Sequence, residues 1–326
     1  MSYPNPVNTI RIGSRGSQLA LWQANHIAAI LRENGHNVEI EVIRTTGDRM
    51  QQPGFVAPAG VDGKGIFIKE IEDALAAGRI DLAVHSLKDL PTTLDPRFTL
   101  AAIPPRADAR DAFVCEPFWA LHTLPHAGLV GTNSPRRRAQ LLALRPDLRF
   151  VELRGNIDTR LRKLEEGQCD ALVLACAGLD RIGRTESVHQ RFDLDELIPA
   201  PGQGALALET RSPSHQIEGD HPHRDREIFK AIQALDHPPT RYATDAERAF
   251  LAAMGGGCEL PLGAHCFATD AFARTWKMYA QVLSPDGEQT VQVTKNSAAG
   301  ESAHALGGRT AQSLIELGAM DLLNGA

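Results

Sequence analysis

The first two thirds of the chain alternate short apolar runs with stretches in which apolar residues recur every three or four positions. The short runs predict strands, and the stretches with helical spacing predict amphipathic helices. Such alternation is typical of a mostly parallel sheet covered by helices on both faces. The predicted strands are 9–12, 38–43, 80–85, 128–130, 149–153, 171–175 and one that ends near 209 after a crossing segment. The predicted helices are 18–33, 66–77, 135–144, 157–166 and a short one that ends at 182.

The pattern changes after about residue 240, where helices flank a predicted hairpin rather than alternate with single strands. The hairpin is predicted from two strands around Ser284-Pro285-Asp286-Gly287, which is a favourable turn sequence. Together these elements predict a small α+β module. Its predicted elements are a helix at 241–254, strands at 262–268, 275–283 and 290–294, and a helix at 301–317.

Two stretches carry no periodic pattern. Residues 211–227 are polar and predict a boundary, and we interpret the histidine pair His221 and His223 there as linker rather than metal site. Residues 48–63 are rich in glycine, proline and alanine. A structureless stretch of that length inside a domain is typical of a lid or a disordered segment.

Length and composition then narrow the class of protein. The 326 residues suggest two domains or three small ones, and 43% hydrophobic with 23% charged residues excludes wholesale disorder. No apolar run approaches the ~18 residues of a membrane span, so we expect no membrane association. The N-terminal hexapeptide lacks the basic and apolar parts of a secretion signal, and the five cysteines form no Cys-x-x-Cys. We therefore expect a cytoplasmic protein with free thiols and no metal site.

Charge is unevenly distributed along the chain. The formal net charge is −6, yet residues 131–163 carry nine basic and three acidic side chains, which leaves −12 on the other 293 residues. A basic cluster on an acidic body suggests a site for a small polyanion. A nucleic-acid surface is less favoured, because Phe150 is the only aromatic residue in the cluster and bases need a stacking platform.

Four polar clusters follow predicted strands, at the edge where open parallel sheets bind ligands. The clearest is Gly131 to Arg137, in which Ser134 can cap a helix whose free N–H groups attract an anion. Arginine binds carboxylates in a bidentate manner, so a cleft with this many arginines suits a ligand with several carboxylates. The other clusters are 14–17, 85–89 and 154–156 with Arg160 one turn later.

Cysteine 258 is a candidate functional thiol. It follows Gly255-Gly256-Gly257, which would place it on a bare loop where it could meet a ligand. The other four cysteines are best interpreted as small buried hydrophobic residues. Neither a P-loop nor a dinucleotide-binding glycine motif is present, so ATP and NAD are not indicated.

The chain resembles the porphobilinogen deaminase (hydroxymethylbilane synthase) family from near residue 9 to the C-terminus. Seven motifs carry the resemblance in order: 11–24, 63–70, 83–91, 131–137, 153–156, 201–205 and 256–258. The resemblance implies two α/β lobes like those of type II solute-binding proteins, with mixed, mostly parallel sheets, and a small C-terminal α+β domain that bears the cysteine. It implies lobe 1 at 1–104 and 200–222, lobe 2 at 105–199, and the third domain at 223–326.

The same resemblance implies a transferase of tetrapyrrole (haem) biosynthesis. It would condense four porphobilinogen molecules head-to-tail with loss of ammonia, on a dipyrromethane cofactor attached through a thioether to Cys258, to give hydroxymethylbilane. Each added pyrrole brings an acetate and a propionate, which fits the cluster of arginines. Loss of ammonia leaves a cation that a carboxylate would stabilise, and by motif that carboxylate is Asp89. We expect a monomer.

The remaining site residues are carried over by motif as groups that bind the carboxylates or amides of cofactor and substrate. They are Arg15, Ser17, Lys64, Ser86, Lys88, Thr132, Asn133, Ser134, Arg136, Arg137, Arg154, Gly155, Asn156, Arg160, Arg181 and Gln203. Asn133 stands where the family usually has serine, a change that keeps the capacity to bind an anion.

Two alternatives remain open on the sequence alone. A two-lobed protein could bind a polycarboxylate without turning it over, in which case no covalent adduct forms and neither Asp89 nor Cys258 is needed. An RNA-binding protein could use the basic segment, in which case binding would be sensitive to salt.

Overall fold

The computed structural model describes residues 9–46, 68–115, 120–215, 222–257 and 260–324. The chain forms two compact units. The first comprises Met1–Pro105 and Leu206–His237, and the second comprises Arg106–Ala205 and Pro238–Ala326. The chain therefore passes from one unit to the other three times, near residues 105, 205 and 237.

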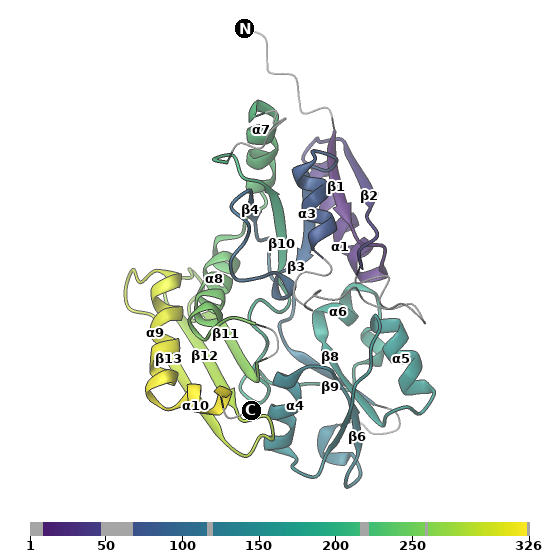
Figure 1. Cartoon of the computed structure of the whole chain (residues 1–326), viewed down its shortest axis with the longest axis vertical. Helices are drawn as coiled ribbons and strands as arrows, with labels where there is room; N and C mark the ends of the chain where they lie inside the picture. Colours follow the sequence, from purple (N-terminus) through teal and green to yellow (C-terminus); the bar gives the residue numbers. More distant parts are fainter. Residues whose placement is uncertain (1–8, 47–67, 116–119, 216–221, 258–259, 325–326) are drawn as a thin grey trace. The chain divides into compact units, whose positions relative to one another are not determined.

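The first unit is built on a five-stranded sheet (Figure 1). In spatial order its strands are β2 (Val38–Val42), β1 (Ile10–Ser14), β3 (Leu82–Ser86), β10 (Leu206–Arg211) and β4 (Phe98–Ala102). β10 is antiparallel to both of its neighbours, so the other four strands share one direction.

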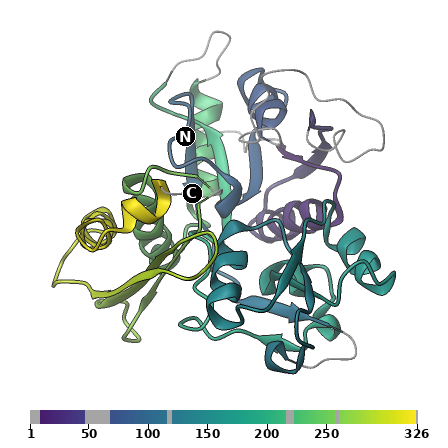
Figure 2. The same cartoon turned by 60° about the horizontal axis from the view of Figure 1, so that its bottom comes forward.

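Helices cover both faces of this sheet, as Figure 2 shows for α1 (Gln18–Glu33) and α3 (Lys69–Ala76). The core on one face combines α1 with α7 (Pro222–Gln233), and α3 packs on the other face. After β3 a single 3-10 turn, Leu87–Asp89, carries the chain away from the sheet edge. The carboxyl ends of the neighbouring parallel strands β1 and β3 thus meet at one edge of the first sheet.

The second unit contains a sheet with the same strand order and the same single reversed strand. Its strands are β7 (Arg149–Val151), β6 (Leu129–Gly131), β8 (Ala171–Ala175), β5 (Asp111–Val114) and β9 (Gln190–Arg191). Here β5 is the antiparallel strand. Helix α4 (Pro135–Leu144) packs on one face, and α5 (Ile157–Glu165) and α6 (Cys176–Arg181) pack on the other.

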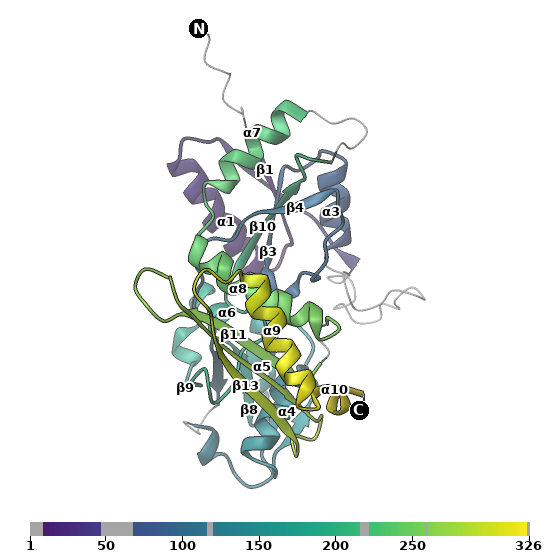
Figure 3. The same cartoon turned by 90° about the vertical axis from the view of Figure 1, so that its left-hand side faces the viewer.

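A three-stranded antiparallel sheet completes the second unit. It consists of β11 (Leu262–Ala268), β12 (Trp276–Leu283) and β13 (Thr290–Asn296). Helices α8 (Pro238–Ala253), α9 (Ala303–Glu316) and α10 (Ala319–Asn324) share one apolar core with it (Figure 3). The predicted α+β module is thereby confirmed.

The predicted fold class is confirmed, since both five-stranded sheets are mixed and mostly parallel. The sequence pattern missed β4, β5, β9 and α7. Helix α7 buries Ile228 and Ile232 in the core of the first sheet, although the expected boundary at 222/223 would assign it to the C-terminal domain. Among the residues that the structure describes, no helix is long and apolar enough to cross a membrane.

Candidate functional site

The first unit gathers polar residues where β1 and β3 end. Arg15 follows β1, and Ser17 begins α1 by accepting a hydrogen bond from the Ala20 backbone N–H at 3.3 Å. Ser86 ends β3, and its hydroxyl accepts a hydrogen bond of 2.9 Å from the buried Gln23 amide of α1. Because β1 and β3 are parallel neighbours, the predicted residues that follow them lie at one sheet edge.

Asp89 stands at the end of the turn after β3. Its side chain is exposed, and it has no hydrogen-bond or ion-pair partner among the described residues. Lys88, one residue earlier, is partly buried. The geometry therefore presents a carboxylate whose oxygens are not engaged by the rest of the described chain, which is the state a catalytic carboxylate needs before substrate arrives.

The second unit has a matching arrangement where β6 and β7 end. Ser134 caps α4 by accepting from the Arg137 backbone N–H at 3.4 Å, and Pro135 fits the first helical turn. Asn133 accepts a hydrogen bond of 3.0 Å from the Leu153 N–H, which ties this loop to the one after β7. The buried Thr132 hydroxyl accepts from the Ser134 N–H. These contacts fix a helix N-terminus at the sheet edge, where its free N–H groups attract an anion.

The loop after β7 leads directly into α5. Gly155 has a φ of +123°, a conformation that disfavours other residues, and Asn156 caps α5 through the Thr159 N–H at 2.9 Å. Arg154 is exposed, and its carbonyl accepts a hydrogen bond from the Lys163 ammonium group. The predicted cluster 154–156 is thus a rigid turn that carries one exposed guanidinium.

Arg160 is the cation that most strongly indicates an anion site. Its Nε donates to the Gly155 carbonyl at 3.0 Å, and no carboxylate of the described residues pairs with it. Burial, and then the positive charge of Arg137, lower its pKa. Burial likewise lowers the pKa of Arg181, to about 10, and that side chain donates to the Gly204 carbonyl. A partly buried cation that pairs with no carboxylate of the described residues, as Arg160 does here, gains stability when an anion binds.

Arg136, Arg137 and Gln203 converge on one carboxylate that the sequence analysis missed, Asp111 at the start of β5. Asp111 is fully buried and lies 2.7 Å from both guanidinium groups, and the Gln203 amide donates to it at 2.9 Å. Burial would raise the pKa of Asp111, but the two arginine charges hold it far below its ordinary value.

This buried cluster gives three predicted residues a partner within the protein. Arg136 is only 3% exposed and also donates to the Ile198 carbonyl, while Gln203 is fully buried. These contacts hold the start of α4 and the crossing segment near Gln203, and ligand binding by Arg136 and Gln203 stays a prediction. The sequence alone does not identify Asp111 as a partner of these residues, because a single aspartate before an apolar run is not a recognisable motif.

Two predicted residues, Lys64 and Cys258, lie outside the described residues. The other four cysteines are free and buried, as expected. Burial raises the pKa of Cys169 to about 11 and that of Cys176 to about 12, so neither thiol is a ready nucleophile. Among the described cysteines, none is therefore suited to attach a cofactor.

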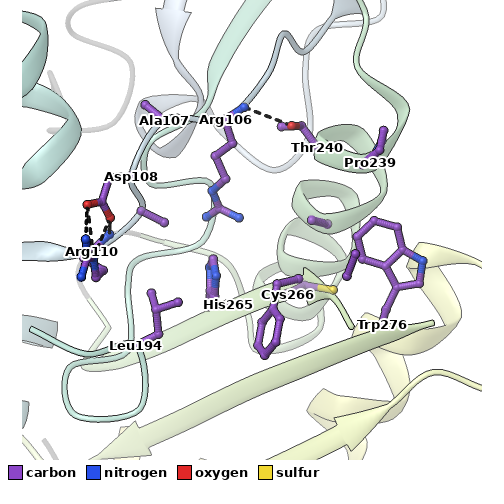
Figure 4. A pocket seen from close by; sticks show the side chains of 14 residues that line it. Arg106, Ala107, Asp108, Arg110, Leu194, Pro239, Thr240, His265, Cys266 and Trp276 are labelled. Atoms are coloured by element: carbon purple, nitrogen blue, oxygen red, sulfur yellow. Dashed lines mark hydrogen bonds and ion pairs between the residues drawn. The ribbon is translucent and has the colours of Figure 1, made fainter. Parts of the chain in front are cut away.

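A cavity of about 310 Å³ lies within the second unit, where the segment after residue 105 meets α8 and β11 (Figure 4). Arg106, His265 and Trp276 are among its lining residues. None of the predicted site residues lines it. The cavity is therefore separate from the anion site, and the described residues contain no group of three potential ligands that could hold a metal.

Two similar mixed sheets with polar loops where their parallel strands end, together with a partly buried Arg160 that pairs with no carboxylate of the described residues, are typical of an α/β protein with a site for an anionic ligand. Comparison with family models identifies it more closely. Residues 10–219 match the model "Porphobilinogen deaminase, dipyromethane cofactor binding domain", and residues 242–316 match "Porphobilinogen deaminase, C-terminal domain". The chain belongs to the porphobilinogen deaminase family, so the predicted transferase activity in tetrapyrrole synthesis is confirmed.

Curated relatives agree over the full length. Porphobilinogen deaminase of Roseiflexus castenholzii is 44% identical, and the match covers 98% of this chain and 99% of the relative's length. Porphobilinogen deaminase of Sulfurimonas denitrificans is 41% identical, and the match covers 97% of this chain and 96% of the relative's length. Among solved structures, the methionine-binding protein MetQ is similar to 70% of this chain and 91% of its own, with 14% identity and a TM-score of 0.42. The family assignment rests on the sequence matches.

Proposed function

We propose that this transferase uses Asp89 as its catalytic carboxylate and Cys258 as the thioether anchor of a dipyrromethane cofactor. The observation that supports the first assignment most directly is the exposed Asp89 carboxylate, which has no partner among the described residues. The second assignment is supported by the family model for a dipyrromethane-binding domain and by the burial of the four other cysteines.

The cation and amide donors of the second unit fit a group with several carboxylates. Arg160 has no carboxylate partner among the described residues, and the N-termini of α4 and α5 offer free N–H groups. We propose that Thr132, Ser134, Arg154 and Arg160 bind the acetate and propionate groups. When bound, the cofactor supplies the primer pyrrole whose free α-carbon forms the new C–C bond.

The proposed role of Asp89 is to stabilise the cation that forms from the substrate. Loss of ammonia from the aminomethyl group of porphobilinogen leaves a cationic carbon, and a nearby carboxylate stabilises that charge and accepts the pyrrole N–H. C–C bond formation then releases a proton. Lys88 and Arg15 lie at the same sheet edge and are proposed to hold substrate carboxylates.

Substituting Asp89 by asparagine tests this assignment. D89N keeps the size of the side chain and one acceptor oxygen but removes the charge and replaces the second acceptor with a donor, so we expect kcat to fall by about 100-fold or more with the fold intact. Porphobilinogen consumption and ammonia release are measured together, since the proposed reaction releases one ammonia per substrate. A kcat within threefold of wild type would show that the Asp89 charge is not used.

We also propose the cellular compartment and the oligomeric state of the protein. Four free buried cysteines fit a reducing compartment such as the cytoplasm. We expect a monomer, which light scattering of the purified protein tests.

Nucleic-acid binding is disfavoured because Arg136 and Arg137 in the basic segment are buried against Asp111 instead of forming a surface. The division into three domains, 1–104 with 200–222, 105–199 and 223–326, remains a proposal, with α7 packed on the first sheet.

A further inference from the structure

Asp111, at the start of β5, holds two neighbouring arginines of α4. Its side chain is fully buried, and Arg137 donates to its Oδ1 from both Nε and Nη2, at 3.0 and 2.7 Å. Its other oxygen, Oδ2, lies 2.7 Å from Arg136 Nη2. The Gln203 amide also donates to Oδ1, at 2.9 Å. One carboxylate thus fixes the orientation of two guanidinium groups.

The hydrogen bonds between Arg137 and Asp111 use only one edge of the guanidinium group. An arginine carries five N–H donors in a rigid planar fork, in which Nε and Nη2 form one edge and Nη1 and Nη2 form another. Asp111 occupies the first edge. Nη1, on the second edge, has no hydrogen-bond or ion-pair partner among the described residues. The first edge is therefore held by the protein, while the second can bind another carboxylate.

Other groups that suit an anion begin at the same edge of the second sheet. Arg137 stands in the first turn of α4, where its backbone N–H donates to the Ser134 cap. Arg160 stands in the first turn of α5, which follows the neighbouring parallel strand. Burial, followed by the positive charge of Arg137, lowers the pKa of Arg160, as expected for two neighbouring cations. A carboxylate bound at this edge would be attracted by both side chains.

The cluster keeps an excess of positive charge even with Asp111 in place. Arg136 and Arg137 share this single carboxylate, so one positive charge is not balanced within the cluster. A buried positive charge of this kind favours the binding of an anion. Without Asp111, the two guanidinium groups would repel each other, and neither would keep a fixed orientation.

We propose that Asp111 is a positioning residue, which orients the Nη1–Nη2 edge of Arg137 to bind a carboxylate of the pyrrole chain. Arg137 then bridges two carboxylates, one that belongs to the protein and one that belongs to the ligand. Gln203 supports the same oxygen of Asp111 from the crossing segment. The inference rests on the proposed binding of acetate and propionate groups by the second unit, and it is independent of Asp89 and Cys258.

Replacing Asp111 by asparagine tests the positioning role. D111N removes the charge and replaces one acceptor oxygen with an N–H₂ group that faces an arginine. We expect KM for porphobilinogen to rise about tenfold and kcat to change less than threefold, because a charged hydrogen bond to the ligand is no longer oriented. KM does not depend on how much of the enzyme is folded, so a variant that only folds less well keeps the KM of wild type. A KM within twofold of wild type would overturn the proposal.

Asp108 provides the matched control, three residues earlier in the chain. Its carboxylate also pairs with two arginines, Arg110 and Arg191, each at 2.8 Å, and neither is a predicted site residue. D108N therefore removes a comparable charge from the same segment, and its KM should stay within twofold of wild type. Equal rises in KM for D108N and D111N would overturn the proposal, because the effect would not be specific to Asp111.

A double-mutant cycle shows whether Asp111 acts through Arg137. R137Q removes the guanidinium group but leaves Arg136 and Asp111 as a balanced ion pair. When D111N is added to R137Q, KM should rise by less than twofold further, because the side chain that Asp111 orients is already absent. Independent effects of the two substitutions, which multiply in KM, would contradict a role through Arg137.

Lysine at position 137 gives a second test that keeps the charge of the cluster. A lysine can bind Asp111 or a ligand carboxylate, but it lacks the planar fork that reaches both in a fixed geometry. R137K should therefore also raise KM about tenfold, and circular dichroism checks that it is folded. If D111N does not fold, R137K decides alone, and a KM within twofold of wild type then overturns the proposal.

The glutamine variant of Arg160 separates this inference from the proposed function. R160Q tests carboxylate binding at the same sheet edge and does not touch the Asp111 cluster. If R160Q raises KM while D111N and R137K behave as wild type, the positioning role fails and carboxylate binding by this unit stands. If all three variants keep the KM of wild type, both proposals fail.

Discussion

The arginines of the basic segment differ in whether a carboxylate pairs with them, and the sequence alone does not show this difference. Arg136 and Arg137 both pair with the buried Asp111, whereas Arg160 pairs with no carboxylate of the described residues. The sequence correctly predicted a local excess of positive charge and the polar clusters at strand ends. It could not show which cations stay available, because that depends on Asp111, a residue distant along the chain that only the folded sheet brings to them.

Arg160 should therefore contribute directly to binding of the polycarboxylate. R160Q removes a cation that we propose binds a carboxylate, and a charge-assisted hydrogen bond contributes about 1.5–3 kcal/mol. We expect KM for porphobilinogen to rise by about tenfold or more, as measured by steady-state kinetics. Alternatively, the fraction of enzyme that retains product intermediates should fall by a similar factor, as measured by native mass spectrometry.

The control lies two residues further along α5. Arg162 is exposed and paired with Glu166 one turn away, so R162Q should behave as wild type. Equal effects of the two substitutions would mean that general positive charge, and not the partly buried Arg160, binds the ligand.

Secondary elements were predictable where local signals were strong. Helices α1 and α4 begin and end where the sequence predicted, because Ser17 and Ser134 provide caps and the apolar spacing is regular. β4 and β5 were missed because they are short and gain their stability from β10 and β8, which lie far away in sequence. Helix α7 was missed because its polar start obscured the two isoleucines that it buries.

The packing of helix α8 against helix α9 provides a test at the level of secondary structure elements. A Cβ atom at Gly307 would lie 2.2 Å from the Ala246 carbonyl oxygen of α8, whereas one at Gly308 would meet nothing within 4 Å. G307A should destabilise the protein by about 1–3 kcal/mol through overpacking. G308A should stabilise it by about 0.5–1 kcal/mol because alanine favours the helix. Urea denaturation measures both, and a stabilising G307A would contradict the described packing.

Within the second unit, one buried carboxylate joins three parts of the chain. Glu247 of α8 accepts from Arg106 at 2.7 and 3.0 Å, from the Gly202 N–H at 2.7 Å and from the Cys266 N–H at 2.8 Å. Arg106 and Gly202 belong to two of the three segments on which the chain crosses between units. Glu247 thereby binds α8 and β11 to both of these segments, an arrangement that no local sequence pattern could predict.

Removing the charge of Glu247 should cost much stability. Burial would raise its pKa, but Arg106 and His265 lower it to about 2. A lowered folded pKa contributes stability that is present above the unfolded value of 4.5 and is lost as pH falls toward 2. E247Q should lower the free energy of unfolding at pH 7 by about 3 kcal/mol because Arg106 is left buried without its partner.

The difference between E247Q and wild type should shrink as the pH falls from 4.5 toward 2, which denaturant titrations at several pH values would follow. A difference that is independent of pH would show that Glu247 acts through its shape and not through its charge.

The proposed activity depends on a covalent primer in a protein that binds acidic pyrroles. The intact mass of the purified wild-type chain tests this most directly, with C258S measured beside it. We predict that the wild type exceeds the mass of its polypeptide by one dipyrromethane and that C258S does not. An active wild-type protein at the bare polypeptide mass, or an adduct that persists in C258S, would contradict the account.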